Sequence, residues 1–122
     1  MHDFQKLKVW QMAMELTKRV YECSRSFPKE ERFGLTQQMT RSAVSIPSNI
    51  SEGAGRNSEK EFNYFLGIAN GSSFELQTQW ILARNFGFLN EENYSEVLDK
   101  IDHVQKMIFK LQQTIKTKIN NQ

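Results

Sequence analysis

The stretch from Ser58 to Phe86 limits the possible folds of this chain most. Its apolar positions recur at alternating steps of four and three residues, and this 3.5-residue spacing is typical of the packing seam of a helical bundle. The seam consists of Phe62, Leu66, Ala69, Ser73, Leu76, Trp80 and Ala83. More apolar residues lie off the seam, at Phe65, Ile68, Phe74, Ile81, Leu82 and Phe86. We therefore expect an all-α fold in which this segment is the central and most buried helix.

Helical periodicity extends over the rest of the chain. The predicted helices cover about residues 4–26, 34–53, 58–86 and 90–118 of one domain spanning residues 1–122. Start and stop signals are expected at Asp3, Ser58 with Glu61, Gly87 and Asn90. Short polar connections make consecutive helices antiparallel neighbours. The sequence thus predicts an antiparallel up-down-up-down four-helix bundle.

Pro47 lies inside the second helical pattern. A proline removes one backbone hydrogen bond and costs about 3 kcal/mol in a helix interior, so we predict a kink there. Ser45 and Ser48 are candidates to satisfy the freed backbone groups through their hydroxyls. Gly53 or Gly55 is expected to end this helix in the left-handed conformation.

Several short motifs along the chain carry a family resemblance. They are Phe4-x-x-Leu7-x-Val9-Trp10, Phe27-Pro28-x-x-Glu31-Arg32-Phe33-Gly34-Leu35, Arg41-x-Ala43-x-Ser45-Ile46-Pro47-Ser48-Asn49-Ile50-x-Glu52-Gly53, Gly55-Arg56-x-Ser58-x-x-Glu61-Phe62 and Gly71-Ser72-x-x-Glu75-Leu76-x-Thr78-Gln79. With these motifs the chain resembles the small bacterial four-helix-bundle proteins first noticed in intervening sequences of 23S ribosomal RNA genes, the S23-like type. One departure is Thr40, where the resemblance leads us to expect a second basic residue or an apolar one.

The resemblance implies assembly into a ring of five protomers, a homopentamer. A similar protein, the accessory variability determinant of diversity-generating retroelements, acts beside a reverse transcriptase and binds nucleic acid and the polymerase through a basic ring surface. The residues support assembly independently, because helix 4–26 has a second apolar face and helix 58–86 is apolar nearly all round. Gly67 and Gly71 would allow close backbone approach. The candidate interface residues are Trp10, Met14, Tyr21, Phe65, Gly67, Gly71 and Phe74.

The charges are distributed unevenly between the two ends of such a bundle. One end would carry seven basic residues against four acidic ones, and the opposite end four basic residues against six acidic ones. The basic residues are Lys6, Lys8, Arg56, Lys60, Lys110, Lys116 and Lys118. Helix dipoles explain the late lysines of the last helix but not Lys6 and Lys8 at a helix start.

This basic end predicts contact with the backbone of RNA or DNA, or with a ribonucleoprotein, and the resemblance implies a polymerase as another partner. No recognition-helix or base-stacking motif indicates sequence reading. The alternative function is a protein–protein interaction scaffold that binds no nucleic acid.

Charged residues near the second helix have two interpretations. Arg41, Glu52 and Glu75 are predicted to form a structural polar network within or between protomers, with Arg41 and Glu52 as its main pair. The alternative is an anion site formed by Arg56 and the free N–H groups at the start of helix 58–86.

The sequence offers little for catalysis. Neither His2 nor His103 has metal-ligand neighbours at a suitable spacing, and Cys23 lies in an apolar helical pattern typical of a buried thiol. We therefore predict a non-enzymatic protein without metal or cofactor. No apolar run reaches the ~20 residues of a membrane-spanning helix, and the N-terminal residues lack a signal-peptide pattern, so a cytoplasmic location is expected.

Overall fold

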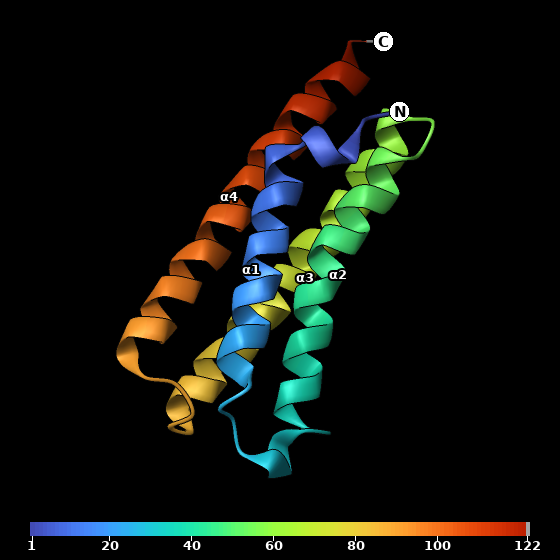
Figure 1. Ribbon diagram of the computed structural model, residues 1–122. Coiled ribbons are helices and arrows are strands. Elements are labelled where there is room, and N and C mark those ends of the chain that lie inside the picture. Colours follow the sequence, from blue (N-terminus) through green and yellow to red (C-terminus); the bar gives the residue numbers. More distant parts are fainter. Residues whose placement is uncertain (122) are drawn as a thin grey trace.

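A computed structural model of the chain describes residues 1–121 and shows an all-α protein (Figure 1). Two short 3-10 helices accompany the four α-helices. The elements are η1 (Phe4–Lys6), α1 (Lys8–Ser24), η2 (Lys29–Glu31), α2 (Leu35–Ala54), α3 (Glu59–Asn85) and α4 (Glu91–Asn120). These bounds confirm the predicted order of four helices.

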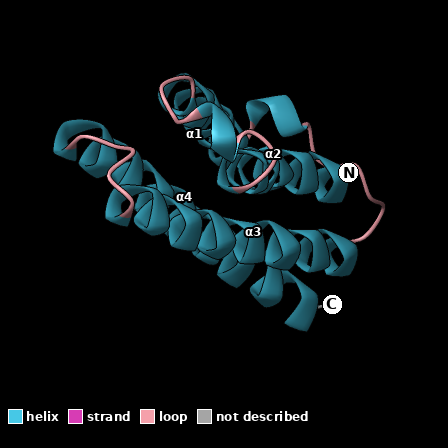
Figure 2. Ribbon diagram, turned by 90° about the horizontal axis from the view of Figure 1, so that it is seen from below, coloured by secondary structure: helices cyan, strands magenta, loops and turns pink. Residues whose placement is uncertain are grey.

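The four helices run up and down in chain order. Helix α2 packs against α1 and α3, and α4 packs against α3 and α1, which closes the bundle. Seen from below, α1 and α2 form one layer and α3 and α4 the other (Figure 2). Both chain ends and the α2–α3 turn lie at the same end of the bundle (Figure 1). We call this end the basic end, after the seven basic residues named above.

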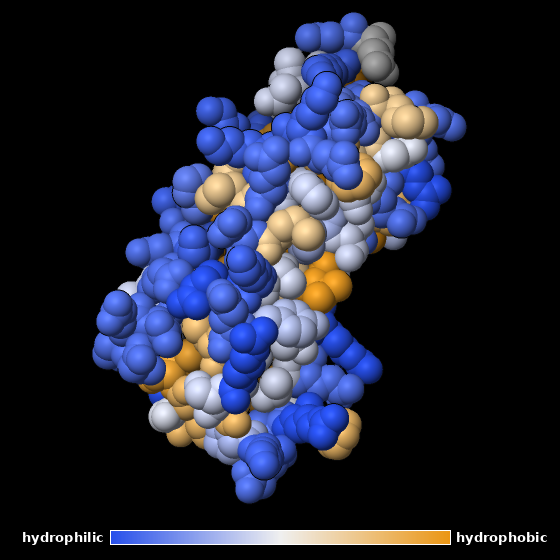
Figure 3. All heavy atoms as spheres, in the orientation of Figure 1, coloured by the Kyte–Doolittle hydropathy of each residue, from blue (hydrophilic) through white to orange (hydrophobic). Residues whose placement is uncertain are grey.

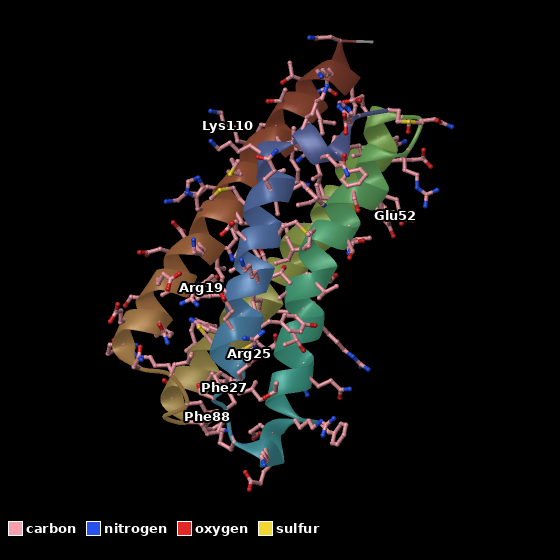
Figure 4. The ribbon with its side chains drawn as sticks, viewed as in Figure 1. Arg19, Arg25, Phe27, Glu52, Phe88 and Lys110 are labelled. Atoms are coloured by element: carbon pink, nitrogen blue, oxygen red, sulfur yellow. The ribbon has the colours of Figure 1, made fainter. Side chains whose placement is uncertain are left out.

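The predicted packing seams form the core. All seven seam residues of α3 are buried, and Trp80 at its lower part is fully enclosed. The Trp80 indole N–H donates to the carbonyl oxygen of Tyr94 at 3.0 Å, which satisfies the buried polar atom and links α3 to the first turn of α4. At the end opposite the basic end, the rings of Phe27 and Phe88 pack with centroids 5.5 Å apart (Figure 4).

The beginning of the first helix differs from the prediction. Asp3 caps the short η1 helix, where its carboxylate accepts from the Gln5 N–H at 3.3 Å. Leu7 is then extended, and α1 starts only at Lys8. Phe4 packs edge-on against Trp10 at 5.1 Å. A separate η1 lets the N-terminal residues turn across the bundle end, which a single helix from Phe4 would not do.

Helix α2 continues unbroken through Pro47, which is buried. Proline leaves the carbonyl four residues earlier, that of Ala43, without its helical N–H donor. The hydroxyl of Thr17 on α1 lies 3.0 Å from this oxygen and 2.8 Å from the Ala13 carbonyl. The freed group is therefore satisfied from the neighbouring helix, and the predicted role of Ser45 and Ser48 is wrong. The bend at Pro47 stays a prediction.

The glycines at the helix ends act differently from one another. Gly87 has φ +81° and ends α3 in a Schellman arrangement, with the Phe88 N–H donating to the Ala83 carbonyl at 2.9 Å, as predicted. Gly55 has φ −81°, so the expected left-handed end of α2 is wrong. Gly53 lies within α2, where an added Cβ would come within 2.7 Å of the Phe65 Cβ. Close packing of α2 on α3 explains that glycine.

Helix α3 was predicted to be the central and most buried helix, but in the protomer only its seam side is buried. Its outer face stays open in the protomer: Phe74 is 53% exposed, and Leu82 and Phe86 are exposed as well. Gly67 and Gly71 lie on this surface, and nothing lies within 4 Å of a Cβ placed at Gly71. The glycines therefore serve no close packing inside one protomer. Within residues 1–121 no helix is both long enough and apolar enough to span a membrane.

Candidate nucleic-acid interface

The topology brings the seven predicted basic residues to one end of the molecule. Lys6 and Lys8 lie at the start of the first helical segment, Arg56 is in the α2–α3 turn, and Lys60 is in the first turn of α3. Lys110, Lys116 and Lys118 belong to the last three turns of α4. All seven side chains are exposed. Lys110 points outward from α4 (Figure 4).

Few of these cations are neutralised by carboxylates. Arg56 forms an ion pair with Glu52 at 2.8 Å, and Lys6 lies 3.9 Å from Asp3. Among residues 1–121 the other five lysines have no carboxylate within ion-pair distance. At the opposite end Arg84 binds Glu91 at 2.9 Å, whereas Arg25, Lys29 and Arg32 also have no carboxylate within ion-pair distance among residues 1–121. Unpaired and exposed ammonium groups are available to an external anion.

Contacts of the N-terminal segment hold Lys6 and Lys8 in place. The His2 N–H donates to the Ala54 carbonyl at 2.7 Å, and the His2 Nε2 lies 2.7 Å from the Glu59 Oε1. The His2 ring also packs on Phe62, with centroids 4.7 Å apart. The segment is thus fastened across the α2–α3 turn, so the basic residues of both elements share one rigid end.

A shallow groove of about 290 Å³ lies between the start of α1 and the last third of α4. Apolar groups dominate its walls, two lysines border it, and no acidic residue lines it. The lining residues are Leu7, Lys8, Val9, Met107, Lys110, Leu111 and Thr114. The surrounding face is mainly hydrophilic, with small hydrophobic areas between the charged residues (Figure 3). A groove of this kind suits an apolar side chain next to a negative charge.

Two aromatic rings also belong to the basic end: Tyr64, which the sequence analysis did not name as a site residue, and Phe65, which it placed in the oligomer interface. Tyr64 is 66% exposed, and its ring meets that of Phe65 edge-on at 5.3 Å. The Arg56 guanidinium lies over the Phe65 ring at 5.0 Å. Tyr64 follows Lys60 by one helical turn. This spacing was the sequence signal that could have identified Tyr64 as a site residue.

The predicted polar network is not formed inside the protomer. Glu52 pairs with Arg56, whereas Arg41 and Glu75 are exposed and meet no ion-pair partner among residues 1–121. The expected pair of Arg41 with Glu52 does not form within the protomer, because Glu52 turns to Arg56 and Arg41 lies about three helical turns away along α2. An intersubunit network stays a prediction. Arg56 faces Glu52 and Phe65, so the alternative anion site with the α3 N–H groups gains no support.

A different polar cluster fixes α2 on α3. The Asn49 side-chain amide donates to the Ser45 carbonyl at 2.8 Å and to its hydroxyl at 2.9 Å. The hydroxyls of Ser45 and Ser72 lie 2.7 Å apart. The polar residues around Pro47 thus join two helices through uncharged groups.

The remaining residues considered for catalysis or metal binding are Cys23 and His103. Cys23 is buried, and burial raises the pKa of its thiol, which disfavours the nucleophilic thiolate. His103 is exposed on α4. Residues 1–121 contain no group of three or more His, Cys, Asp or Glu placed to hold a metal ion.

The ion pair between Arg19 and Glu96 joins α1 to α4. The guanidinium contacts both carboxylate oxygens, at 2.6 and 2.8 Å. The hydrogen bonds from Arg19 lower the pKa of Glu96.

The fold and the charged end define a small up-down four-helix protein with an exposed basic end. Residues 5–110 match the family of 23S rRNA-intervening sequence proteins, and the chain belongs to that family. A solved structure of a protein of unknown function from the S23 ribosomal protein family of Bacteroides thetaiotaomicron has the same fold, with a TM-score of 0.80. It is 22% identical to this chain, and the match covers 86% of this chain and 95% of that one. No curated protein matches.

Proposed function

We propose that this protein is a non-enzymatic accessory protein whose basic end binds the phosphate backbone of RNA or DNA, alone or within a ribonucleoprotein. The observation that carries the proposal is the set of five exposed lysines at one end that have no ion-pair partner among residues 1–121. Ammonium groups of this kind release counterions when they neutralise phosphates. Such binding fixes position on the nucleic acid and carries little sequence information.

Binding of a generic 20-base-pair DNA duplex at low salt tests the proposal. The variant K110Q/K116Q/K118Q should lose at least about ten-fold in affinity, because each lysine contributes an electrostatic contact to phosphate. A matched control, K18Q/K29Q/K100Q, removes the same charge from other parts of the surface. Equal losses in the two variants, or no binding by the unmodified chain at low salt, would contradict the proposal.

We further propose that protomers assemble through their uncovered apolar faces into a closed ring, five-membered as the resemblance implies. Met14 and Tyr21 on α1 are 46% and 45% exposed, and Phe74 on α3 is 53% exposed. Trp10 is half-buried one helical turn from Met14 on α1. The predicted interface residue Phe65 is half-buried on the side of α3 that faces Gly53 of α2. Two different apolar faces favour a head-to-tail interface, which closes into a ring when the rotation permits. A ring would align the basic ends of all its protomers.

A protein-binding scaffold is the second candidate function. The groove between α1 and α4 favours it, since its apolar lining suits a partner side chain better than a phosphate backbone. Leu111→Ser would weaken the binding of a protein partner in this groove and leave binding of the DNA duplex unchanged. A duplex affinity that falls with this substitution would argue against a separate protein site.

A further inference from the structure

An exposed aromatic ring lies among the cations of the basic end. Tyr64 on α3 is 66% exposed, the largest value among the apolar and aromatic side chains of that helix. A ring with an open face is a surface on which an unpaired base can stack, and such stacking accepts any base.

The ring is also held in place. Gly53 allows α2 to approach α3 so closely that an added Cβ would lie 2.7 Å from the Phe65 Cβ, which fixes the start of that side chain. The Phe65 ring meets Tyr64 edge-on at 5.3 Å and 82°, and it carries the Arg56 guanidinium at 5.0 Å. Tyr64 is therefore supported from one side and open on the other.

Cations surround this ring. Lys60 precedes Tyr64 by four residues and so lies on the same face of α3 one turn away. The antiparallel register of α3 and α4 is set by the side-chain hydrogen bond between Gln77 and Gln105 at 2.9 Å and by the approach of Gly67 to Gln112. One turn further, the same register places Lys116 level with Tyr64.

The one carboxylate near Tyr64 on α3 is directed elsewhere. The Glu61 side chain accepts from the Ser58 hydroxyl at 3.3 Å, at the start of the helix. The Glu52 carboxylate pairs with Arg56 at 2.8 Å, so the uncompensated charge near the ring comes from Lys60 and Lys116. This charge complements phosphate groups on either side of a stacked base.

We infer that Tyr64, with Lys60, Arg56 and Lys116 around it, binds an unpaired nucleic-acid strand by stacking one base on its ring. This inference rests on the proposed function and narrows its ligand from any phosphate backbone to a single strand. A paired duplex keeps its bases stacked inside and has no free base for the ring.

The test compares a 15-nucleotide oligouridylate with a blunt 15-base-pair RNA duplex at low salt. Tyr64→Ala should weaken oligouridylate binding about ten-fold, within the range for one base–aromatic stack, and change duplex binding less than about two-fold. Tyr64→Phe keeps the ring and should stay near the unmodified affinity. The salt dependence should not change in Tyr64→Ala, because no phosphate contact is removed.

Phe33→Ala is the matched control, since Phe33 is an exposed aromatic residue outside both the basic end and the proposed interface. Light scattering on each variant shows whether assembly is intact. The inference is overturned if Tyr64→Ala weakens both probes equally or neither, or if Phe33→Ala has the same effect. Duplex and single strand bound equally, with dependence on the lysines, would leave the proposed function standing without the stacking site. If neither the oligouridylate nor the RNA duplex binds, the stacking inference and the proposed function are both overturned.

Discussion

Thr17 solves a local problem created by Pro47 in the next helix. The Ala43 residue is fully buried, so its freed carbonyl has no access to water and depends on the Thr17 hydroxyl at 3.0 Å. The contact joins α1 to α2 at the point where the helix ladder is incomplete. A buried carbonyl without a partner costs about 1–3 kcal/mol.

We predict that Thr17→Val lowers the free energy of unfolding by about 1–2 kcal/mol, because the shape is kept and the donor is lost. Urea denaturation measures the change. Thr78→Val is the control: the Thr78 hydroxyl bonds only within its own helix at an exposed position, so the change should stay within about 0.5 kcal/mol. Equal effects of the two substitutions would show that Thr17 does not satisfy the α2 carbonyl.

Gly53 contributes to stability because it has no side chain, whereas Thr17 contributes through its hydroxyl. An added Cβ would meet the Phe65 Cβ at 2.7 Å and the Phe62 carbonyl at 3.2 Å, and neither atom can move by a simple rotamer change. Gly53→Ala should therefore lower the free energy of unfolding by about 1–3 kcal/mol despite the better helix propensity of alanine. Thermal denaturation of the variant measures this.

Gly55 supplies the comparison two residues later. Its φ of −81° suits any residue, and its nearest contacts for an added Cβ start at 3.6 Å. Gly55→Ala should change stability by less than about 1 kcal/mol. If both substitutions were neutral, the close approach of α2 and α3 at Gly53 would be refuted.

At the scale of elements, the α1–α4 contact depends on an ion pair. Arg19 lowers the pKa of Glu96, so this carboxyl contributes stability above its unfolded value, about 4.3. That stability is lost as the pH falls through the lower folded pKa. Both groups are partly exposed, and solvent screening limits the contribution to about 0.5–1 kcal/mol.

We predict that acidification from pH 7 to pH 3 destabilises the unmodified protein more than Arg19→Met, by about that amount. Urea midpoints at both pH values measure the difference. Arg84→Met is the control, because it removes an exposed pair within the α3–α4 connection. Identical pH dependence in the unmodified protein and Arg19→Met would exclude the ion pair as a source of acid sensitivity.

The sequence was sufficient to predict the four helices and their buried seams. Periodicity identified Phe62, Leu76 and Trp80 as core residues, and the cap residues Ser58 and Asn90 are confirmed by their hydrogen bonds to Glu61 and Asn93. Periodicity and cap residues are local signals, so they can be recognised without knowing which helices pack against one another.

Features that depend on a second element could not be predicted. The extended Leu7 follows from the tie between His2 and Ala54, and the role of Thr17 follows from its distance to α2. The network of Arg41, Glu52 and Glu75 does not form within residues 1–121 of one protomer for the same reason. Charge type gives no direction: Glu52 is four residues from Arg56 and turns to it. The basic end was predictable from the order of the helices. A binding role for Tyr64 was not, because it depends on how exposed the ring is in the folded protein.

On the scale of the whole molecule, the open apolar faces of α1 and α3 should determine the oligomeric state in solution. Light scattering at micromolar concentration should give a mass near five protomers, and Phe74→Ser should reduce it by uncoupling one face. Phe33→Ser is the control, since Phe33 is 79% exposed on the α1–α2 loop outside the proposed interface. A monomer mass for the unmodified chain would contradict assembly through α1 and α3.

The direct test of the central claim, phosphate binding at the basic end, is the salt dependence of duplex DNA affinity. The logarithm of the binding constant should fall linearly with the logarithm of salt concentration, with a slope of about −0.9 per phosphate neutralised. In K110Q/K116Q/K118Q the slope should become shallower by about one for each lysine that contacts a phosphate. A slope near zero, or an unchanged slope in this variant, would contradict the account.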